Sequence, residues 1–132
     1  MFLKHVALVC SSKEKSDIFY AELLGLNKSE HKTLPTELSK AIFNVDSEIM
    51  MINYLNEHVH FEIFIGGPGG ENSPKIEHTC LEIDDLDEFL EKCSNLNVNI
   101  TRIPKGDKIL TFIRDFDGNL FEIKERIKEL GD

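Results

Sequence analysis

The feature that most constrains how this chain folds is an internal repeat. Residues 4–10 and 76–83 both have the apolar patterning of a strand, and each is followed by a Ser-x-x-Glu or Asp-x-x-Glu pattern that predicts the start of a helix. The first predicted helix ends at Gly25, a residue suited to the left-handed conformation that closes many helices. The second carries apolar residues at helical spacing from Leu86 to Leu96. The repeat predicts two structurally equivalent modules.

Strand candidates follow each predicted helix. In the first half they lie at 41–45, 48–55 and 59–65, with a polar stretch at 27–33 that suits an edge strand; in the second half they lie at 98–103, 108–113 and 120–124. An Asp-Gly step at 117–118 predicts a turn between the last two. We therefore predict an α+β fold in which two βαβββ modules form a curved mixed sheet with a concave metal-binding face.

Length and composition suit one domain. The chain has 132 residues, of which 41% are hydrophobic, enough to bury a core without disulfide or metal staples. A Gly- and Pro-rich stretch between the halves has the composition of a linker. We expect a single domain over 1–132, with module one at about 1–66, the linker at about 67–74 and module two at about 75–126.

Charge and hydropathy exclude several classes of partner. The formal net charge is −9 and no basic run offsets it, which argues against a nucleic-acid partner. No apolar run approaches the roughly 20 residues that span a bilayer, and from the residues before the first strand we expect no signal sequence. The three cysteines, Cys10, Cys80 and Cys93, lack CxxC spacing, so we expect small buried thiols rather than disulfides or a zinc knuckle. We expect a cytoplasmic protein that does not bind membranes.

Two histidines and two glutamates occupy matching places in the two halves. His5 and His78 each lie near the start of the first strand of their half. Glu62 and Glu122 each interrupt an apolar run in the last strand, where burying an unpaired charge is costly unless a cation or hydrogen bonds compensate. Because strands alternate their faces, both glutamates can point away from the core.

These four residues predict a metal site. If the halves pair about a pseudo-twofold axis, two imidazoles and two carboxylates converge, which suits a divalent ion with room for two waters. Taken singly, a strand histidine is more often a surface or core residue, and a strand glutamate is usually solvated. The placement of all four at repeat-equivalent positions favours the metal site.

The motifs around these residues resemble the vicinal-oxygen-chelate superfamily and, within it, bacterial glyoxalase I (lactoylglutathione lyase). The resemblance covers nearly the whole chain, including Phe19-Tyr20-x-x-Leu23-Leu24-Gly25-Leu26 and Asp115-x-Asp117-Gly118-Asn119. Glyoxalase I is similar to this chain in its His, Glu, His, Glu ligand order. Members that use oxygen or fosfomycin generally have two His and one Glu, and methylmalonyl-CoA epimerase usually has Gln or a similar residue where Glu62 stands.

The resemblance implies an isomerisation of the hemithioacetal of methylglyoxal and a small thiol to a lactoyl thioester. It implies Glu122 as principal base and Glu62 as its partner, and a homodimer, as is common for small proteins. It also implies activation by nickel or cobalt rather than zinc, in agreement with the octahedral preference of a site with four side chains and two waters. An epimerase and a non-catalytic ligand-sequestering module of the same fold stay as alternatives.

Other residues bear on the substrate. The Lys105-Gly106 step resembles a Lys-Gly loop that contacts the thiol's carboxylate in glyoxalase I, and Arg102 is a second candidate for substrate binding, although a solvated loop explains both equally well. Val9 and Gly66 stand where glutathione-using relatives typically have Arg and Asn, which predicts weaker dependence on glutathione. His60 is a candidate partner that supports a metal ligand, an alternative ligand itself, or simply a partly exposed strand histidine.

Overall fold

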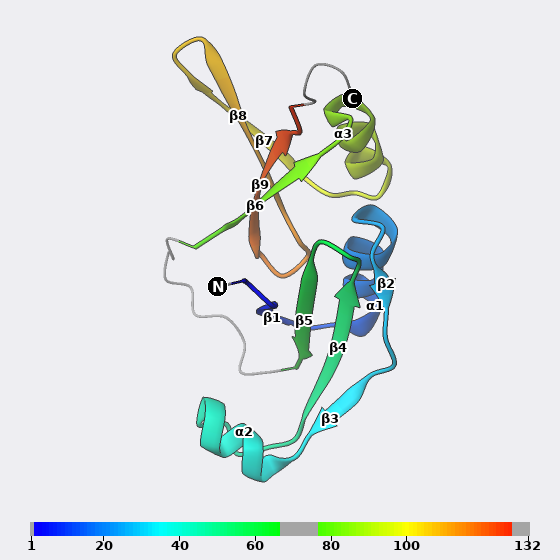
Figure 1. The fold of residues 1–132 in the computed structure, drawn as a ribbon, viewed down its shortest axis with the longest axis vertical. Coiled ribbons are helices and arrows are strands. Elements are labelled where there is room, and N and C mark those ends of the chain that lie inside the picture. The colour runs from blue at the N-terminus through cyan, green and yellow to red at the C-terminus, as the bar shows by residue number, and fades with distance from the viewer. Residues whose placement is uncertain (1, 67–76, 128–132) are drawn as a thin grey trace. The chain divides into compact units, whose positions relative to one another are not determined.

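The computed structural model describes residues 2–66 and 77–127, so the linker predicted at about 67–74 lies outside the described residues. The chain divides into two compact units, Met1–Ser73 and Pro74–Asp132, which correspond to the two arms of the repeat (Figure 1). Each unit contains its own mixed sheet, one of five strands and one of four.

Module one has its first and last strands side by side and parallel, and its sheet order is β1-β5-β4-β2, with β3 also paired to β4. Its elements in chain order are β1 (Val6–Cys10), α1 (Lys13–Ser16), the π-helix η1 (Asp17–Leu23), β2 (Asn27–Lys28), β3 (Lys32–Leu34), α2 (Thr36–Phe43), β4 (Ile49–Leu55) and β5 (His60–Ile65). The polar stretch predicted as an edge strand forms β2 and β3, which pair with β4 one after the other.

The first helix begins and ends close to the predicted residues. Ser12, rather than Ser11, is its N-cap, and the Ser12 hydroxyl accepts a hydrogen bond from the backbone N–H of Lys15 at 3.2 Å. Gly25 has φ +71°, which confirms the left-handed residue after the helix. The apolar stripe of Phe19 and Leu23 is buried, so this helix packs its predicted face into the core of module one.

The strand predicted at 41–45 is wrong, because most of this segment is the second half of helix α2. The apolar run Ala41-Ile42-Phe43 is too short to distinguish a strand from a helix by its periodicity. The deciding signals flank it: Pro35 precedes the first turn, and Asn44 adopts the left-handed conformation (φ 58°) that closes the helix, with its N–H donating to the Lys40 carbonyl.

Module two repeats the arrangement with fewer additions, in the sheet order β6-β9-β8-β7 with β6 parallel to β9. Its elements are β6 (Thr79–Ile83), α3 (Leu86–Asn95), β7 (Ile100–Lys105), β8 (Lys108–Arg114) and β9 (Leu120–Glu125). Asp85 caps α3 by accepting from the Glu88 N–H at 3.0 Å. The predicted turn before β9 is held by the buried Asp115 carboxylate, which accepts from the backbone N–H groups of Asp117 and Asn119.

Both modules confirm the predicted α+β fold of two βαβββ-like units, and both alternate their faces as expected. Phe61 and Ile63 are buried on either side of Glu62, and Phe121 and Ile123 are buried on either side of Glu122. The two glutamates are only partly buried, because they lie on the face of each sheet that the core does not cover. Among the described residues, no helix combines the length and the apolar character needed to span a bilayer.

Candidate functional site

In module one, the fold brings His5 next to Glu62. His5 directly precedes β1, and the parallel register of β1 and β5 pairs Ala7 with Glu62. Because residues two apart on a strand share a face, His5 lies on the same side of the sheet as Glu62. The His5 Nε2 and Glu62 Oε2 atoms are 3.4 Å apart, and the side chains are 38% and 19% exposed.

Module two contains the equivalent pair in the equivalent geometry. His78 precedes β6, and the parallel register of β6 and β9 pairs Cys80 with Glu122. The His78 Nε2 and Glu122 Oε1 atoms are 3.7 Å apart, with side-chain exposures of 47% and 15%. Each module thus places one imidazole and one carboxylate together on its open sheet face.

The donor atoms in each pair are spaced as ligands of one ion would be. Two donors that each lie about 2.1 Å from a divalent ion are about 3.0 Å apart at a right angle and about 3.4 Å apart at a tetrahedral angle. The observed 3.4 and 3.7 Å need only small side-chain adjustments, so both pairs fit a metal. Within the described ranges, no group of three or more His, Cys, Asp or Glu side chains is arranged to hold an ion. The meeting of all four residues at one ion therefore stays a prediction.

Polar residues surround the pair in module one. Asn53 lies directly across from Glu62 on β4, and its Oδ1 is 2.7 Å from Nε2 of His60. Because an amide oxygen only accepts, this contact places the proton on Nε2 of His60. The ring of His60 also lies against that of His5, with centroids 5.5 Å apart. Asn53 was not among the residues predicted from the sequence, although it interrupts an apolar strand just as Glu62 does.

Module two surrounds its pair differently. Phe112 takes the place across from Glu122, and its ring meets that of His78 edge-on, with centroids 6.3 Å apart. Cys80 was expected to be buried with Cys10 and Cys93, but it is exposed, because it shares the open face of the sheet with Glu122. Partial burial raises the pKa of the Cys80 thiol, and the negative charge of Glu122 raises it further.

The two predicted substrate-binding residues lie on opposite faces of the β7–β8 hairpin. Lys105 pairs with Lys108 across a two-residue turn, in which Gly106 has the positive φ (+63°) that the turn requires. The register gives Lys105 the same face as Phe112 and hence Glu122, whereas Arg102 pairs with the buried Thr111 and lies on the other face. Both are exposed, and their roles stay predictions.

The two departures from the glutathione-using pattern lie at the far ends of the two strands that follow His5 and carry Glu62. Val9 is half exposed and shares the face of β1 with Ala7, the partner of Glu62. Gly66 directly follows β5 with φ +81°, and its N–H donates to the Cys10 carbonyl at 2.9 Å. The hydrogen bond ties the end of β5 to the end of β1.

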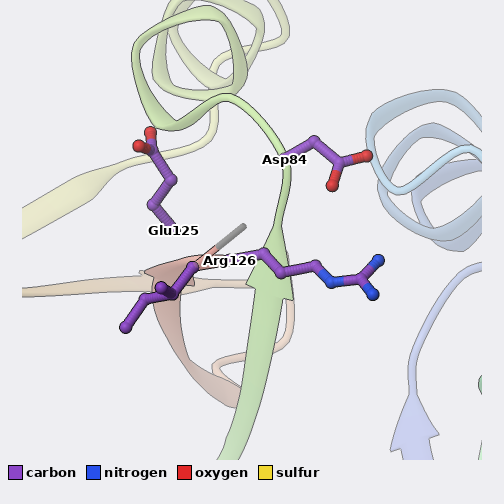
Figure 2. Close-up of a pocket in the computed structure, with 4 residues that line it drawn as sticks. Asp84, Glu125 and Arg126 are labelled. Atoms are coloured by element: carbon purple, nitrogen blue, oxygen red, sulfur yellow. The ribbon is translucent and has the colours of Figure 1, made fainter. Parts of the chain in front are cut away.

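A pocket in module two lies away from the candidate ligands and is lined by Asp84, Glu125, Arg126 and Ile127 (Figure 2). Glu125 lies three residues after Glu122 on β9, so its side chain lies on the other face of the sheet. Its carboxylate points toward the first turn of α3 (Figure 2) and accepts from the Leu86 N–H at 2.9 Å. One of the polar groups that line this pocket is thus already engaged with the start of a helix.

Comparisons with known proteins agree with this fold. The model of the Glyoxalase/Bleomycin resistance protein/Dioxygenase superfamily matches residues 2–123. A comparison with curated proteins gives no match. Among solved structures, the chain is similar to a glyoxalase family protein from Enterococcus faecalis (19% identity, TM-score 0.71, covering 92% of this chain and 95% of that one). It is also similar to a glyoxalase family protein from Bacillus cereus (17%, 0.73, 96% and 94%).

A third similar structure is the fosfomycin resistance protein FosX from Listeria monocytogenes, crystallised with Mn(II) and a sulfate ion (19% identity, TM-score 0.69, covering 96% of this chain and 93% of that one). The glyoxalase-family and FosX structures are equally close in fold. At these identities, the likenesses establish the fold alone.

Proposed function

The chain belongs to the Glyoxalase/Bleomycin resistance protein/Dioxygenase superfamily, and we propose that it is a metal-dependent isomerase of the glyoxalase I (lactoylglutathione lyase) type. This superfamily is the vicinal-oxygen-chelate superfamily that the sequence motifs resemble. The observation that carries the proposal is the repeated His–Glu pair, at 3.4 Å in module one and 3.7 Å in module two. A ligand set with two carboxylates supplies a candidate base for each of the two proton transfers of an isomerisation.

His5, Glu62, His78 and Glu122 would hold one divalent ion, with nickel or cobalt preferred to zinc because four side chains and two waters make an octahedral set. When bound, the ion supplies Lewis-acid stabilisation of the two neighbouring substrate oxygens. The Mn(II) bound by FosX from Listeria monocytogenes supports a divalent ion in this fold.

The two glutamates would move the proton. In the proposed reaction, a proton leaves the carbon that bears oxygen and sulfur, and a proton is delivered to the neighbouring carbon. Glu122 and Glu62 are 15% and 19% exposed, so each lies at a surface that substrate can reach while its flanking strand residues stay buried. We assign Glu122 as principal base and Glu62 as its partner in the second transfer.

The thiol half of the substrate would contact groups outside the two pairs. Lys105 would attract a carboxylate of the thiol, and the strand register that puts it on the same face of its sheet as Glu122 supports this role. The half-exposed Val9 offers no charge where glutathione-using relatives have Arg. We therefore propose a small thiol other than glutathione, or weak use of glutathione.

The experiment is to load the protein with nickel and supply methylglyoxal with glutathione, cysteine or coenzyme A in turn. We expect a lactoyl thioester from at least one thiol. Methylmalonyl-CoA and fosfomycin are supplied in parallel, since an epimerase shares the chemistry and FosX shares the fold. Turnover of either of these without turnover of any hemithioacetal would replace the glyoxalase assignment, and binding without turnover would indicate a sequestering module.

We also propose that the protein works as a homodimer, the commonest symmetric assembly of small proteins. Sedimentation velocity at micromolar concentration should give the mass of two chains. A single species of 15.1 kDa would contradict this proposal.

A further inference from the structure

His60 and Asn53 form a hydrogen-bonded pair next to the candidate ligands of module one. We infer that His60, anchored by Asn53, is a positioning residue that holds the His5 imidazole in the orientation in which it binds metal together with Glu62. The inference rests on the metal site of the proposed function, and it does not depend on which reaction the site performs.

The anchor is a short hydrogen bond between two neighbouring strands. His60 is the first residue of β5, and Asn53 lies on β4, which pairs with β5 in antiparallel register. The 2.7 Å contact between His60 Nε2 and Asn53 Oδ1 is partly buried. Because both backbones are fixed by the sheet, a hydrogen bond between the two side chains leaves the imidazole of His60 little freedom to rotate.

His5 needs such a neighbour because its own backbone is less constrained. It lies one residue before β1, outside the β1–β5 ladder, and its side chain is 38% exposed. His60 contacts the His5 ring, with centroids 5.5 Å apart and planes inclined by 57°. Glu62 lies 3.4 Å from the Nε2 of His5. His5 is therefore in contact with two residues of β5 that share a face, His60 and Glu62.

Module two shows what the same place looks like without this pair. Leu120 and Phe112 stand where His60 and Asn53 stand in module one, as the matching registers show. Phe112 contacts the His78 ring directly and edge-on, at 6.3 Å. A large aromatic ring thus restrains His78 by packing alone, whereas the restraint on His5 passes through a hydrogen bond that a near-isosteric substitution removes.

The test compares Asn53→Leu, His60→Leu and the double variant with His58→Leu as a matched control. His58 is also a histidine of module one, but its side chain is 77% exposed and its ring pairs only weakly with Glu57 at 3.4 Å. Each metal-free protein is titrated with Co²⁺ alone by calorimetry, and the visible absorption of the cobalt form is recorded. Thermal melting fixes a temperature at which every variant is folded, and Asn53→Ala replaces Asn53→Leu if the latter does not fold.

We expect Asn53→Leu and His60→Leu each to weaken Co²⁺ binding about tenfold, the lower end of what loss of a group that orients a ligand costs. The cobalt spectrum should change with it, and His58→Leu should match the unmodified protein. Because Asn53 acts through His60, the double variant should be no weaker than His60→Leu. Equal affinity and spectrum in all variants, or losses that add in the double variant, would overturn the inference.

One further measurement separates positioning from direct ligation. Pulsed electron paramagnetic resonance of a bound Cu²⁺ ion detects its imidazole ligands, and the signal of His60→Leu should show the same number as that of the unmodified protein. Loss of one imidazole would make His60 a ligand and overturn the positioning role. A protein that binds Co²⁺ as expected but makes no lactoyl thioester refutes the proposed function and leaves this inference standing.

Discussion

The two modules contain the same pair of candidate ligands, a histidine and a glutamate, but differ in the residues that surround it. In both, a histidine precedes the first strand, a glutamate lies in the parallel last strand, and the nitrogen and oxygen atoms are 3.4 or 3.7 Å apart. The residue across from the glutamate is polar in module one, Asn53, and aromatic in module two, Phe112. The histidine and the glutamate thus occupy equivalent backbone positions in both modules, while the residues that surround them differ in polarity.

The connections of the modules differ in the same way. In module one, β3 and β4 are joined through helix α2, whereas in module two β7 and β8 are joined by two residues and carry Lys105 and Lys108 at the turn. Figure 1 shows α2 beyond the ends of β3 and β4 in module one and the β7–β8 hairpin in module two. Loops and edges tolerate such variation because they do not position the ligands.

The largest effect should come from the two glutamates. Glu122→Gln should preserve the fold but lower kcat by about 100-fold or more, since Gln neither accepts a proton nor offers its charge to the metal. Glu62→Gln should weaken both the rate and metal binding. Steady-state kinetics on the nickel-loaded variants measures both. Full activity in both variants would remove the proposed roles of the glutamates, and a greater loss of rate in Glu62→Gln would reverse them.

The next effect concerns a polar contact between helix η1 and the sheet of module one, whose positions are occupied by apolar residues in module two. The Tyr54 hydroxyl donates to Asp17 at 2.6 Å, and Lys28 lies 2.9 Å from the same carboxylate. Desolvation acts to raise the pKa of Asp17, but the bonds from Tyr54 and Lys28 outweigh it and lower the pKa overall. Leu90 and Ile113 are the buried residues at the corresponding places in module two.

Tyr54→Phe should therefore cost about 2 kcal/mol of unfolding free energy, as for a hydrogen bond to a charged group. A carboxyl whose pKa is lowered by folding stabilises the fold above its unfolded pKa, and this is lost as pH falls through the folded pKa. The cost should thus be present at pH 7 and shrink below about pH 4. Urea unfolding at pH 7 and below about pH 4 measures this cost in unfolding free energy. As the control in module two, Ile113→Val should cost about 1 kcal/mol of unfolding free energy at either pH. A cost of Tyr54→Phe that does not change with pH would contradict the role given to the Asp17 carboxylate.

These contrasts show what the sequence can predict. The alternating strands, and the placement of Glu62 and Glu122 on the faces that the cores do not cover, were predictable because a charged residue inside an apolar run is visible without any tertiary information. Helix α2 was not, because Ala41–Phe43 suits both a strand and a helix, and the flanking Pro35 and Asn44 decide. The hydrogen bond that His60 donates to Asn53 could not be predicted either, since it depends on the register of β4 against β5.

The identity of the preferred metal tests whether the His–Glu pairs of the two modules bind one ion together. Two pairs that share an ion supply two nitrogens and two oxygens, which suit the octahedral nickel and cobalt ions better than zinc. Protein stripped with a chelator and restored separately with nickel, cobalt and zinc should be about tenfold faster with nickel or cobalt than with zinc. If the zinc form is fastest, the coordination argument and the nickel-type assignment fail together.

The smallest effect concerns the first strands, where Val9 in module one corresponds to Glu82 in module two, since both lie on the open face four residues after the ligand histidine. Val9→Arg should lower the KM for the glutathione hemithioacetal about fivefold, the value of a solvent-screened ion pair of about 1 kcal/mol, and leave kcat nearly unchanged. Glu82→Gln changes the net charge by the same amount in the other module and serves as the control.

If both variants lower the KM equally, long-range charge rather than a contact at residue 9 is responsible. A KM for glutathione already in the low micromolar range in the unmodified protein would show instead that Val9 and Gly66 do not weaken glutathione binding.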